Sequence, residues 1–396
     1  MGGRRPAGPI VARMSRRVAV AGTIADSVHH ERSGGRLDPP TSRRETWSMN
    51  SSESSQAGTR RRAVLELPKV ELHQHVDGSI PLDVMWRTMV ENNLNPVETP
   101  EEMEKLLVLQ ADEEGTLLRY LDKFHYPLWV TQFYENIVEV VQAIVEAAHR
   151  SGVRTLELRY APIIHTYGGL TLRQTIRSVL TGMNRGSAGR DMEVGLIIIA
   201  MRHHGPHIAK ILARSAISEA QQLHKSAGVV GFDIAGAEKG NPPRLFREAY
   251  DVARGGRLGL TAHVGEDEGP KMIWHALDEL GVQRVGHGCT AVGDRELMQR
   301  LARDRILVEC CVTSNYQTGA ALRTARHPIH AFLEAGVPVA ICTDNTTVSA
   351  TDQTRENLLL LDDLGVDGLR AIHATAREFS FIQTADEVQD PATRAR

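Results

Sequence analysis

The chain has 396 residues, a length that fits one large domain, including a barrel of roughly 250 residues or more. Its 46 lysines and arginines are balanced by 49 aspartates and glutamates, so no broad cationic surface for nucleic acid is expected. No apolar run is long enough to span a bilayer. A small-molecule substrate is therefore the class of ligand that the composition favours.

The first 62 residues are rich in Arg, Ser, Gly and Pro and have no sustained periodicity, which is typical of a disordered tail. The Arg-rich opening also resembles a targeting peptide, but its apolar stretch is too short. We interpret the tail as dispensable, with Met49 as a candidate start. Residues 386–396 are polar and are expected to form a flexible C-terminal tail. The functional domain is predicted to span residues 63–385.

From Val70 onward, short apolar runs alternate with longer helical patterns, which indicates parallel strands joined by crossover helices. Eight strands are predicted, so the fold class is α/β, a (β/α)8 TIM barrel. The predicted strands are residues 70–76, 155–161, 194–201, 229–235, 259–264, 284–288, 307–313 and 337–343. Polar residues cluster where these runs end, and a barrel builds its site at the carboxyl ends of its strands.

A long insertion of helical pattern, roughly residues 81–151, separates the first two predicted strands. Its apolar residues, including Leu121 and Phe124, are candidates for a lid that closes over the substrate and excludes water. The alternative is that these side chains only pack into the core. In either case the insertion is expected beside the site.

Three histidines and one aspartate at the ends of predicted strands form a candidate metal site. His73 and His75 are two residues apart on the first strand, so their side chains point to the same face. His263 lies near the end of the fifth strand, and Asp344 follows the eighth. This ligand set suits one zinc ion per chain with an open position for water, although other divalent metals accept the same ligands.

Glu266 and His287 are the candidate catalytic residues. Glu266 follows His263 by three residues, where the chain can aim a carboxyl back toward the metal. A partly buried glutamate with a raised pKa can deliver a proton near neutral pH. His287 is flanked by Gly286 and Gly288, so it can approach closely and polarise or orient the attacking water.

The cysteines give a prediction of the cellular compartment. They lie late in the chain, within apolar segments, and show no Cys-X-X-Cys spacing, which disfavours a structural zinc site. The four positions are Cys289, Cys310, Cys311 and Cys342. We interpret them as buried thiols of a reducing compartment and predict a cytoplasmic protein.

Six segments, taken together and in order, resemble the adenosine deaminase family of metal-dependent aminohydrolases, from about residue 67 to residue 381. They are Leu-His-Gln-His-Val-Asp-Gly at 72–78, Phe-Asp-Ile-Ala-Gly-Ala-Glu at 232–238, Thr-Ala-His-Val-Gly-Glu at 261–266, Val-Gly-His-Gly at 285–288, Thr-Ser-Asn-Tyr-Gln-Thr-Gly at 313–319 and Thr-Asp-Asn at 343–345. The resemblance implies a zinc-containing barrel of the amidohydrolase superfamily that converts adenosine, and with it 2′-deoxyadenosine, to inosine and ammonia in purine salvage. It also implies that Glu266 protonates purine N1 and that His287 assists the attack on C6.

The same resemblance implies three contacts with a purine nucleoside substrate. The backbone of Gly236 would meet purine N3, and Asp77 would accept a hydrogen bond from the ribose 5′-hydroxyl. The family often has a second carboxylate near purine N7, where this chain has Asn345. An amide NH2 can also donate to N7, but it cannot titrate.

Alternative functions remain open at this stage. A relative could deaminate adenine or a 5′-extended adenosine such as 6-aminodeoxyfutalosine, in menaquinone biosynthesis, with pocket walls from loops near His165 and Arg202. A two-metal amidohydrolase commonly needs a bridging lysine or carboxylate on the fourth strand, where Lys239 is displaced, so one metal is predicted. A non-catalytic nucleoside-binding barrel would be expected to lack a ligand or the acid. Oligomeric state and regulation cannot be read from the chain.

Overall fold

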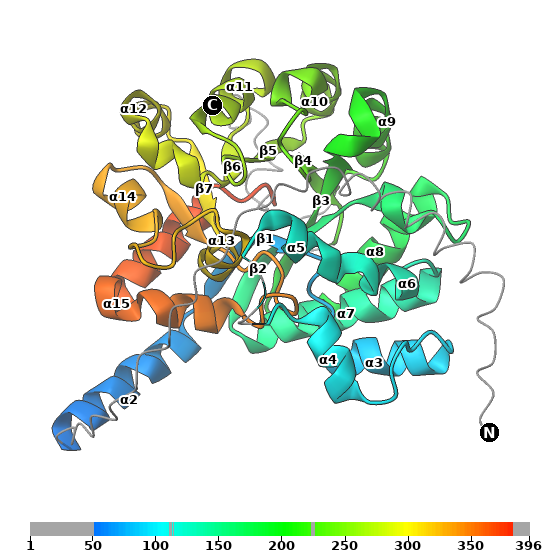
Figure 1. The fold of residues 1–396 in the computed structure, drawn as a ribbon, viewed down its shortest axis with the longest axis horizontal. Helices are drawn as coiled ribbons and strands as arrows, with labels where there is room; N and C mark the ends of the chain where they lie inside the picture. Colours follow the sequence, from blue (N-terminus) through cyan, green and yellow to red (C-terminus); the bar gives the residue numbers. More distant parts are fainter. Residues whose placement is uncertain (1–50, 111–112, 114, 223–225, 383–396) are drawn as a thin grey trace, which may run out of the picture.

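The computed structural model describes residues 51–382 except 111–112, 114 and 223–225. Eight strands form one sheet, in which each strand pairs in parallel with the next strand of the chain. The strands are β1 (Lys69–His75), β2 (Val153–Tyr160), β3 (Glu193–Met201), β4 (Val229–Ala235), β5 (Gly259–Val264), β6 (Arg284–His287), β7 (Leu307–Cys310) and β8 (Val339–Ile341). The predicted (β/α)8 barrel is confirmed, and Figure 1 shows helices arranged around these strands.

The sheet nearly closes on itself between its first and last strands. Gln74 and Asp344 form an isolated parallel bridge. The His75 backbone N–H donates to the Asp344 carbonyl at 2.7 Å, and the Asp344 N–H donates to the His73 carbonyl at 2.8 Å. Closure therefore joins the segment after β8 to the His-Gln-His segment of β1.

Helices fill the connections between successive strands, and most of the apolar core lies between them and the outer face of the barrel. Of the described helices, α2 (Ser51–Glu66) precedes β1 and α15 (Gln353–Glu378) follows β8. Beyond short 3-10 and π turns, the helices between strands are α3 (Leu82–Glu91), α4 (Pro100–Leu107), α5 (Leu117–Leu121), α6 (Pro127–Val130), α7 (Tyr134–Arg150), α8 (Leu172–Ser187), α9 (Gly205–Ser218), α10 (Arg247–Gly255), α11 (Pro270–His275), α12 (Arg295–Arg303), α13 (Val312–Thr318) and α14 (Ile329–Glu334). None of the described helices is both long and apolar enough to cross a membrane.

The pair α7 and α8 shows how sequence determines the helix layer. Gly182 and Gly186 lie one turn apart on α8, so they share one face. A Cβ at Gly182 would lie 2.7 Å from the Val141 Cβ, and a Cβ at Gly186 would lie 2.6 Å from the Val145 Cβ. Only glycine at these positions lets the two helices pack at this distance.

The interior of the barrel is charged rather than apolar. Five side chains with no exposed surface meet there: Glu157, Arg159, Asp233, Arg284 and Glu309. They form ion pairs with one another, including Arg159 with Asp233 at 2.8 Å and Arg284 with Glu157 at 2.7 Å. Buried charges of this kind are tolerated only when they are paired.

The last described residues close the amino-terminal end of the barrel. The Phe381 ring lies against the guanidinium of Arg284, 3.7 Å from Arg284 Cζ to the ring centroid. Gly231 and Gly259 make room for this ring, because a Cβ at Gly259 would lie 2.1 Å from Phe381 Cγ and one at Gly231 would lie 2.9 Å from Phe381 Cδ2.

Several predicted boundaries differ from the structure. The seventh strand was expected to reach residue 313, but β7 ends at Cys310 and the helix α13 begins at Val312. The eighth was expected over 337–343, but β8 is confined to Val339–Ile341. The helix α2 begins at Ser51, within the tail that was expected to be unstructured, and extends away from the barrel (Figure 1). Residues 1–50 and 386–396 lie outside the described residues.

The insertion and the cysteines agree with their predictions. Helices α3 to α7 occupy the connection between β1 and β2, as expected for residues 81–151. All four cysteines are free and buried. Cys310 ends β7, and Cys311 is the residue between β7 and α13.

Candidate metal and catalytic site

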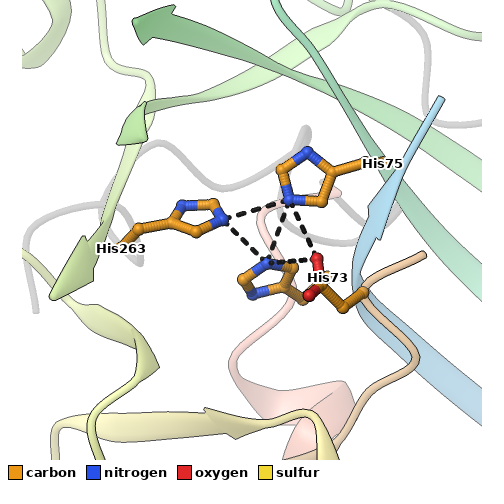
Figure 2. Close-up of side chains that lie close together, drawn as sticks. His73, His75 and His263 are labelled. Atoms are coloured by element: carbon orange, nitrogen blue, oxygen red, sulfur yellow. Dashed lines mark hydrogen bonds and ion pairs between the residues drawn. The ribbon is translucent and has the colours of Figure 1, made fainter. Parts of the chain in front are cut away.

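Three imidazoles and one carboxylate converge at the carboxyl ends of β1, β5 and β8. The Nε2 atoms of His73, His75 and His263 lie 3.0–3.2 Å from one another, and Figure 2 shows the three rings turned toward one point. Asp344 Oδ1 lies 3.3 Å from His75 Nε2 and 3.7 Å from His73 Nε2. A zinc ion with Zn–N bonds of 2.0–2.1 Å separates tetrahedral ligands by about 3.3 Å, so this donor set fits one zinc ion.

The backbone explains why these four side chains meet. His73 and His75 share one face of β1, and β5 carries His263 toward the same end of the barrel. Asp344 follows β8 with φ of 61°, a left-handed conformation that non-glycine residues rarely adopt. Such strain is typical of functional sites, where surrounding contacts hold it. Here the hydrogen bonds of β1 with the Asp344 backbone do so.

Buried carboxylates orient two of the histidines from behind. Glu309 Oε2 lies 2.9 Å from His73 Nδ1, and Asp233 Oδ2 lies 2.9 Å from His263 Nδ1. Arg159 pairs with both carboxylates. Burial alone would raise the pKa of the Asp233 carboxyl. The nearby His263 and Arg159 have the larger, opposite effect, so the pKa of Asp233 lies well below its usual range. Carboxylates in these positions fix which ring nitrogen faces the metal.

Two of the ligands, His73 and His75, are in the neutral form that a metal requires. Burial lowers the pKa of His73 and of His75 well below the usual value for histidine, so both rings are neutral. Asp344 accepts from Ser314 Oγ at 2.5 Å through Oδ2 and from Asn345 Nδ2 at 2.7 Å through Oδ1. These hydrogen bonds orient its carboxylate toward the three imidazoles.

Glu266 lies beside His287, at the end of the barrel that carries the metal ligands. Glu266 Oε2 is 3.6 Å from His287 Nε2. Burial, together with the Asp344 and Glu238 carboxylates, raises the pKa of Glu266 well above its usual range. The Glu238 carboxylate also accepts the backbone N–H groups of Gly265, Glu266 and Asp267 at 2.9–3.0 Å, so it holds the loop that carries Glu266. This arrangement can keep a proton on Glu266 at neutral pH.

The glycines around His287 have the expected steric role. The His287 ring lies 4.9 Å from the His73 ring and 5.2 Å from the His263 ring, measured between centroids. A Cβ at Gly286 would lie 3.1 Å from His73 Cε1. His287 has φ of 62° and Gly288 φ of 60°, so β6 ends in a turn that places the imidazole over the metal ligands.

The three residues expected to contact substrate lie around this centre. Asp77 is buried and follows β1, and burial raises its pKa to about 6. Gly236 follows β4 with φ of 92°, a conformation that favours glycine. Asn345 gives one amide hydrogen to Asp344, while its Oδ1 is buried and has no hydrogen-bond partner among the described residues. A Cβ at Gly78 would lie 1.9 Å from that oxygen, so Asn345 requires glycine there.

The predicted lid residues lie in the insertion, next to the segment after β8. Phe124 packs on a buried cluster formed by Leu109, Tyr120 and Val348. The Tyr120 hydroxyl lies 2.7 Å from Ser349 Oγ, which ties α5 to the residues that follow Asp344 and Asn345. Leu121 ends α5 and is partly buried. The insertion thus borders the metal centre, and lid closure stays a prediction.

Sequence reasoning missed the residues that support the site: Arg159, Asp233, Glu238 and Glu309. A signal for three of them was present, because a charged residue inside a strand of a parallel sheet, which is covered on both faces, must be buried and paired. Arg159 lies in β2, Asp233 in β4 and Glu309 in β7. Their partners were not readable, since each pair joins different strands of the barrel.

Comparison with known proteins agrees with this geometry. The sequence profile of the adenosine deaminase family matches residues 68–389. An adenosine deaminase of Enterococcus faecalis is 33% identical over 321 residues, which cover 81% of this chain and 93% of that protein. A probable adenosine deaminase of Dictyostelium discoideum is also 33% identical, over 297 residues that cover 75% of this chain but only 38% of that protein.

Solved structures with similar folds act on different adenine compounds. The adenine deaminase of Arthrobacter aurescens has a TM-score of 0.73 at 25% identity and covers 83% of this chain and 99% of its own. The N6-methyl-AMP deaminase of Arabidopsis thaliana has a TM-score of 0.70 at 25% identity, with coverage of 83% and 96%. Together with the metal cluster and the family match, these findings establish that the chain belongs to the adenosine deaminase family and is a metal-dependent aminohydrolase.

Proposed function

We propose that the protein catalyses the zinc-dependent hydrolytic deamination of adenosine, and of 2′-deoxyadenosine, to inosine and ammonia in purine salvage. The observation that carries the proposal is the placement of a buried acid, Glu266, and His287 beside the His73, His75, His263 and Asp344 cluster. One zinc ion per chain fits these four ligands. When bound there, zinc brings the pKa of a coordinated water to about 7 and supplies a nucleophile at neutral pH.

Glu266 is the proton donor in this proposal. Its raised pKa favours the protonated form, which can donate to purine N1 as water attacks C6. Protonation at N1 makes C6 more electrophilic, because N1 takes up the electron pair of the C6–N1 π bond as the C6–O bond forms. The Glu266 carboxylate then takes the two protons of the attacking water in turn: it passes one to the amino group, which leaves as ammonia, and the other restores the acid, so that the ring is left as the 6-oxo purine of inosine. His287 orients the attacking oxygen.

Recognition of the nucleoside is assigned to three positions around the centre. Asp77 accepts the ribose 5′-hydroxyl, the backbone N–H of Gly236 donates to purine N3, and Asn345 donates to N7 with the amide hydrogen that Asp344 does not use. Each role is supported by chemistry: a buried carboxyl acceptor, a left-handed glycine and an amide donor. Leu121 and Phe124 belong to the lid that excludes water from the reaction.

Adenine, N6-methyl-AMP and 6-aminodeoxyfutalosine are the alternative substrates, the first two because structural neighbours at 25% identity are named for them. Arg202 is buried, and its two terminal nitrogens donate to the Asn241 carbonyl at 2.5 Å and to the His263 carbonyl at 2.6 Å, so neither of them is directed at a 5′-phosphate. Asp77 would also repel a phosphate when it is ionised. Both observations favour an uncharged 5′-hydroxyl and thus a nucleoside.

Turnover of purified, zinc-loaded protein with a substrate panel tests the proposal. We expect adenosine and 2′-deoxyadenosine to have the highest kcat/KM. The reaction is measured by the loss of absorbance of the adenine ring. Much faster turnover of adenine, N6-methyl-AMP or a 5′-extended adenosine would refute the choice of substrate. The four free, buried thiols support a reducing compartment, so we place the reaction in the cytoplasm.

The role of Glu266 is tested by Glu266→Gln, which removes the acid but none of the metal ligands. We expect kcat to fall by roughly 10²–10⁴-fold, with the zinc content unchanged. Asp267→Asn is the matched control, because it makes the same chemical change on the adjacent, exposed residue of the same loop. Preserved activity in the Glu266 variant would contradict the assigned role.

A further inference from the structure

A chain of three hydrogen bonds runs from a backbone amide to the far side of His287. The Ile329 backbone N–H donates to His327 Nδ1 at 3.1 Å. His327 Nε2 lies 3.1 Å from Asn315 Oδ1, and Asn315 Nδ2 lies 2.9 Å from His287 Nδ1. Asn315, His327 and His287 are at most 3% exposed, so water does not compete for these contacts.

The direction of every hydrogen bond in this chain follows from its first donor. A backbone N–H can only donate, so His327 Nδ1 must accept and carries no proton. Neutral His327 then holds its proton on Nε2 and donates to Asn315, which must present its carbonyl oxygen. The amide NH2 of Asn315 therefore faces His287, an orientation that the positions of the heavy atoms alone would leave ambiguous.

His287 is the end of the chain. Because Nδ1 accepts from the amide of Asn315, neutral His287 carries its proton on Nε2. That nitrogen is the one that faces the site, 3.6 Å from Glu266 Oε2. We propose that Asn315 and His327 are positioning residues that hold His287 as the Nε2–H tautomer, so that His287 donates a hydrogen bond to the attacking oxygen and does not take a proton from it.

This inference rests on the proposed function for the identity of the reaction, but the tautomer can be measured without any substrate. It also explains a feature of the fold. The helix α13 begins immediately after β7, so Asn315 lies close to the ends of the strands, and His327 lies in the segment that leads into α14. Residues of α13 and of the segment before α14 are thereby linked by hydrogen bonds to His287, the last residue of β6.

Asn315→Asp is the decisive variant, because it keeps the size of the side chain and replaces the NH2 donor with an oxygen acceptor. The new carboxylate would face His287 Nδ1 and draw the proton to that nitrogen. Long-range ¹H–¹⁵N correlation spectra of zinc-loaded, ¹⁵N-histidine-labelled protein report which ring nitrogen is protonated, and His287→Gln identifies the signal of His287. We expect an Nε2–H tautomer in the wild type and a proton on Nδ1 in Asn315→Asp.

Kinetics with adenosine supply the second readout. We expect Asn315→Asp to lower kcat by about 100-fold or more, since the wrong histidine tautomer is costly at a catalytic site, while KM changes by less than about threefold. His327→Gln tests the chain one step further out, where we expect a smaller loss in kcat in the same direction. This variant also serves if Asn315→Asp fails to fold.

His373→Gln is the matched control for His327→Gln. His373 Nδ1 accepts from the Val70 backbone N–H at 3.2 Å, and its Nε2 lies 2.8 Å from Asn357 Oδ1, so it forms the same kind of buried histidine–asparagine pair without reaching His287. We expect this variant to keep the wild-type kcat and the Nε2–H signal of His287.

Two results would overturn the inference: an Nδ1–H tautomer of His287 in the wild type, or an unchanged kcat in an Asn315→Asp protein whose His287 proton has moved. Failure of the proposed function looks different, because a protein inactive on adenosine would still show the tautomer of His287 and its response to Asn315→Asp.

Discussion

Glu309 is one of two residues, with Asp233, through which the charged barrel interior contacts the metal ligands, and Glu309→Gln tests that connection. Its Oε2 lies 2.9 Å from His73 Nδ1, and its Oε1 lies 2.8 Å from Arg284 Nε and 3.1 Å from Thr261 Oγ1. The amide of glutamine preserves the shape but removes the negative charge that makes His73 a stronger ligand. Metal binding should therefore weaken without loss of any ligand.

The expected magnitude follows from the role of such a carboxylate. Loss of a group that orients a metal-bound histidine typically lowers metal affinity by 10–100-fold, which is about 1.4–2.7 kcal/mol. Arg159 keeps its pair with Asp233, and Arg284 keeps its pair with Glu157, so neither buried cation is left without a carboxylate. The variant should therefore fold, with its main defect in zinc affinity.

Competition with a chromophoric zinc chelator measures this affinity. Glu157→Gln is the control, because Glu157 is equally buried and also pairs with Arg284, at 2.7 Å, but bonds to Ser380 and Phe381 instead of His73. We expect the control to bind zinc as the wild type does, even where it unfolds more easily. Equal zinc affinities for Glu309→Gln and the wild type would refute the reasoning.

Three further predictions concern the metal, the packing and the pH dependence. Chelation should abolish activity and one equivalent of zinc should restore it; elemental analysis that found two tightly bound metals would contradict the single site. Gly259→Ala should lower the free energy of unfolding by about 1–3 kcal/mol, because its Cβ would lie 2.1 Å from Phe381 Cγ, whereas Gly255→Ala, with nothing within 4 Å, should not; thermal melts of both variants check this. Burial lowers the pKa of His165 from 6.5 to about 3, so between these pH values the unfolded chain binds the extra proton and stability decreases as the pH falls. His165→Phe keeps the ring stacked on Tyr160, so between pH 6.5 and 5 its unfolding free energy in urea should decrease by about 1.5–2 kcal/mol less than that of the wild type, and parallel pH curves would contradict the assignment.

The strands of the barrel were predictable because each combines a short apolar run with a polar residue at its end. β4 and β5 were predicted with the bounds that the structure shows. The larger errors in the strands lie at the ends of β7 and β8, where β-branched residues and cysteines continue past the last ladder hydrogen bond. Val312 and Thr313 favour a strand locally, but the chain turns there into α13, and tertiary contacts override the local preference.

The ligand set was predictable for a related reason. His73 and His75 alternate on one strand, while His263 and Asp344 end others, and the carboxyl ends of all barrel strands meet at one face. Local sequence chemistry plus one rule of topology is enough to bring the four together. Glu266 was predictable from its spacing to His263, because both belong to the same strand end.

The sequence by itself therefore determined the fold class and the metal ligands and placed Glu266 near them, since each depends on short-range patterns repeated around a symmetric barrel. Only the tertiary structure decided what orients them: the carboxylates Asp233 and Glu309, the arginine between them, and the amide that reaches His287. These contacts join residues 28 to 236 positions apart in the chain. Their partners depend on the register and tilt of neighbouring strands, and no local pattern of one strand specifies which side chain of another lies opposite it.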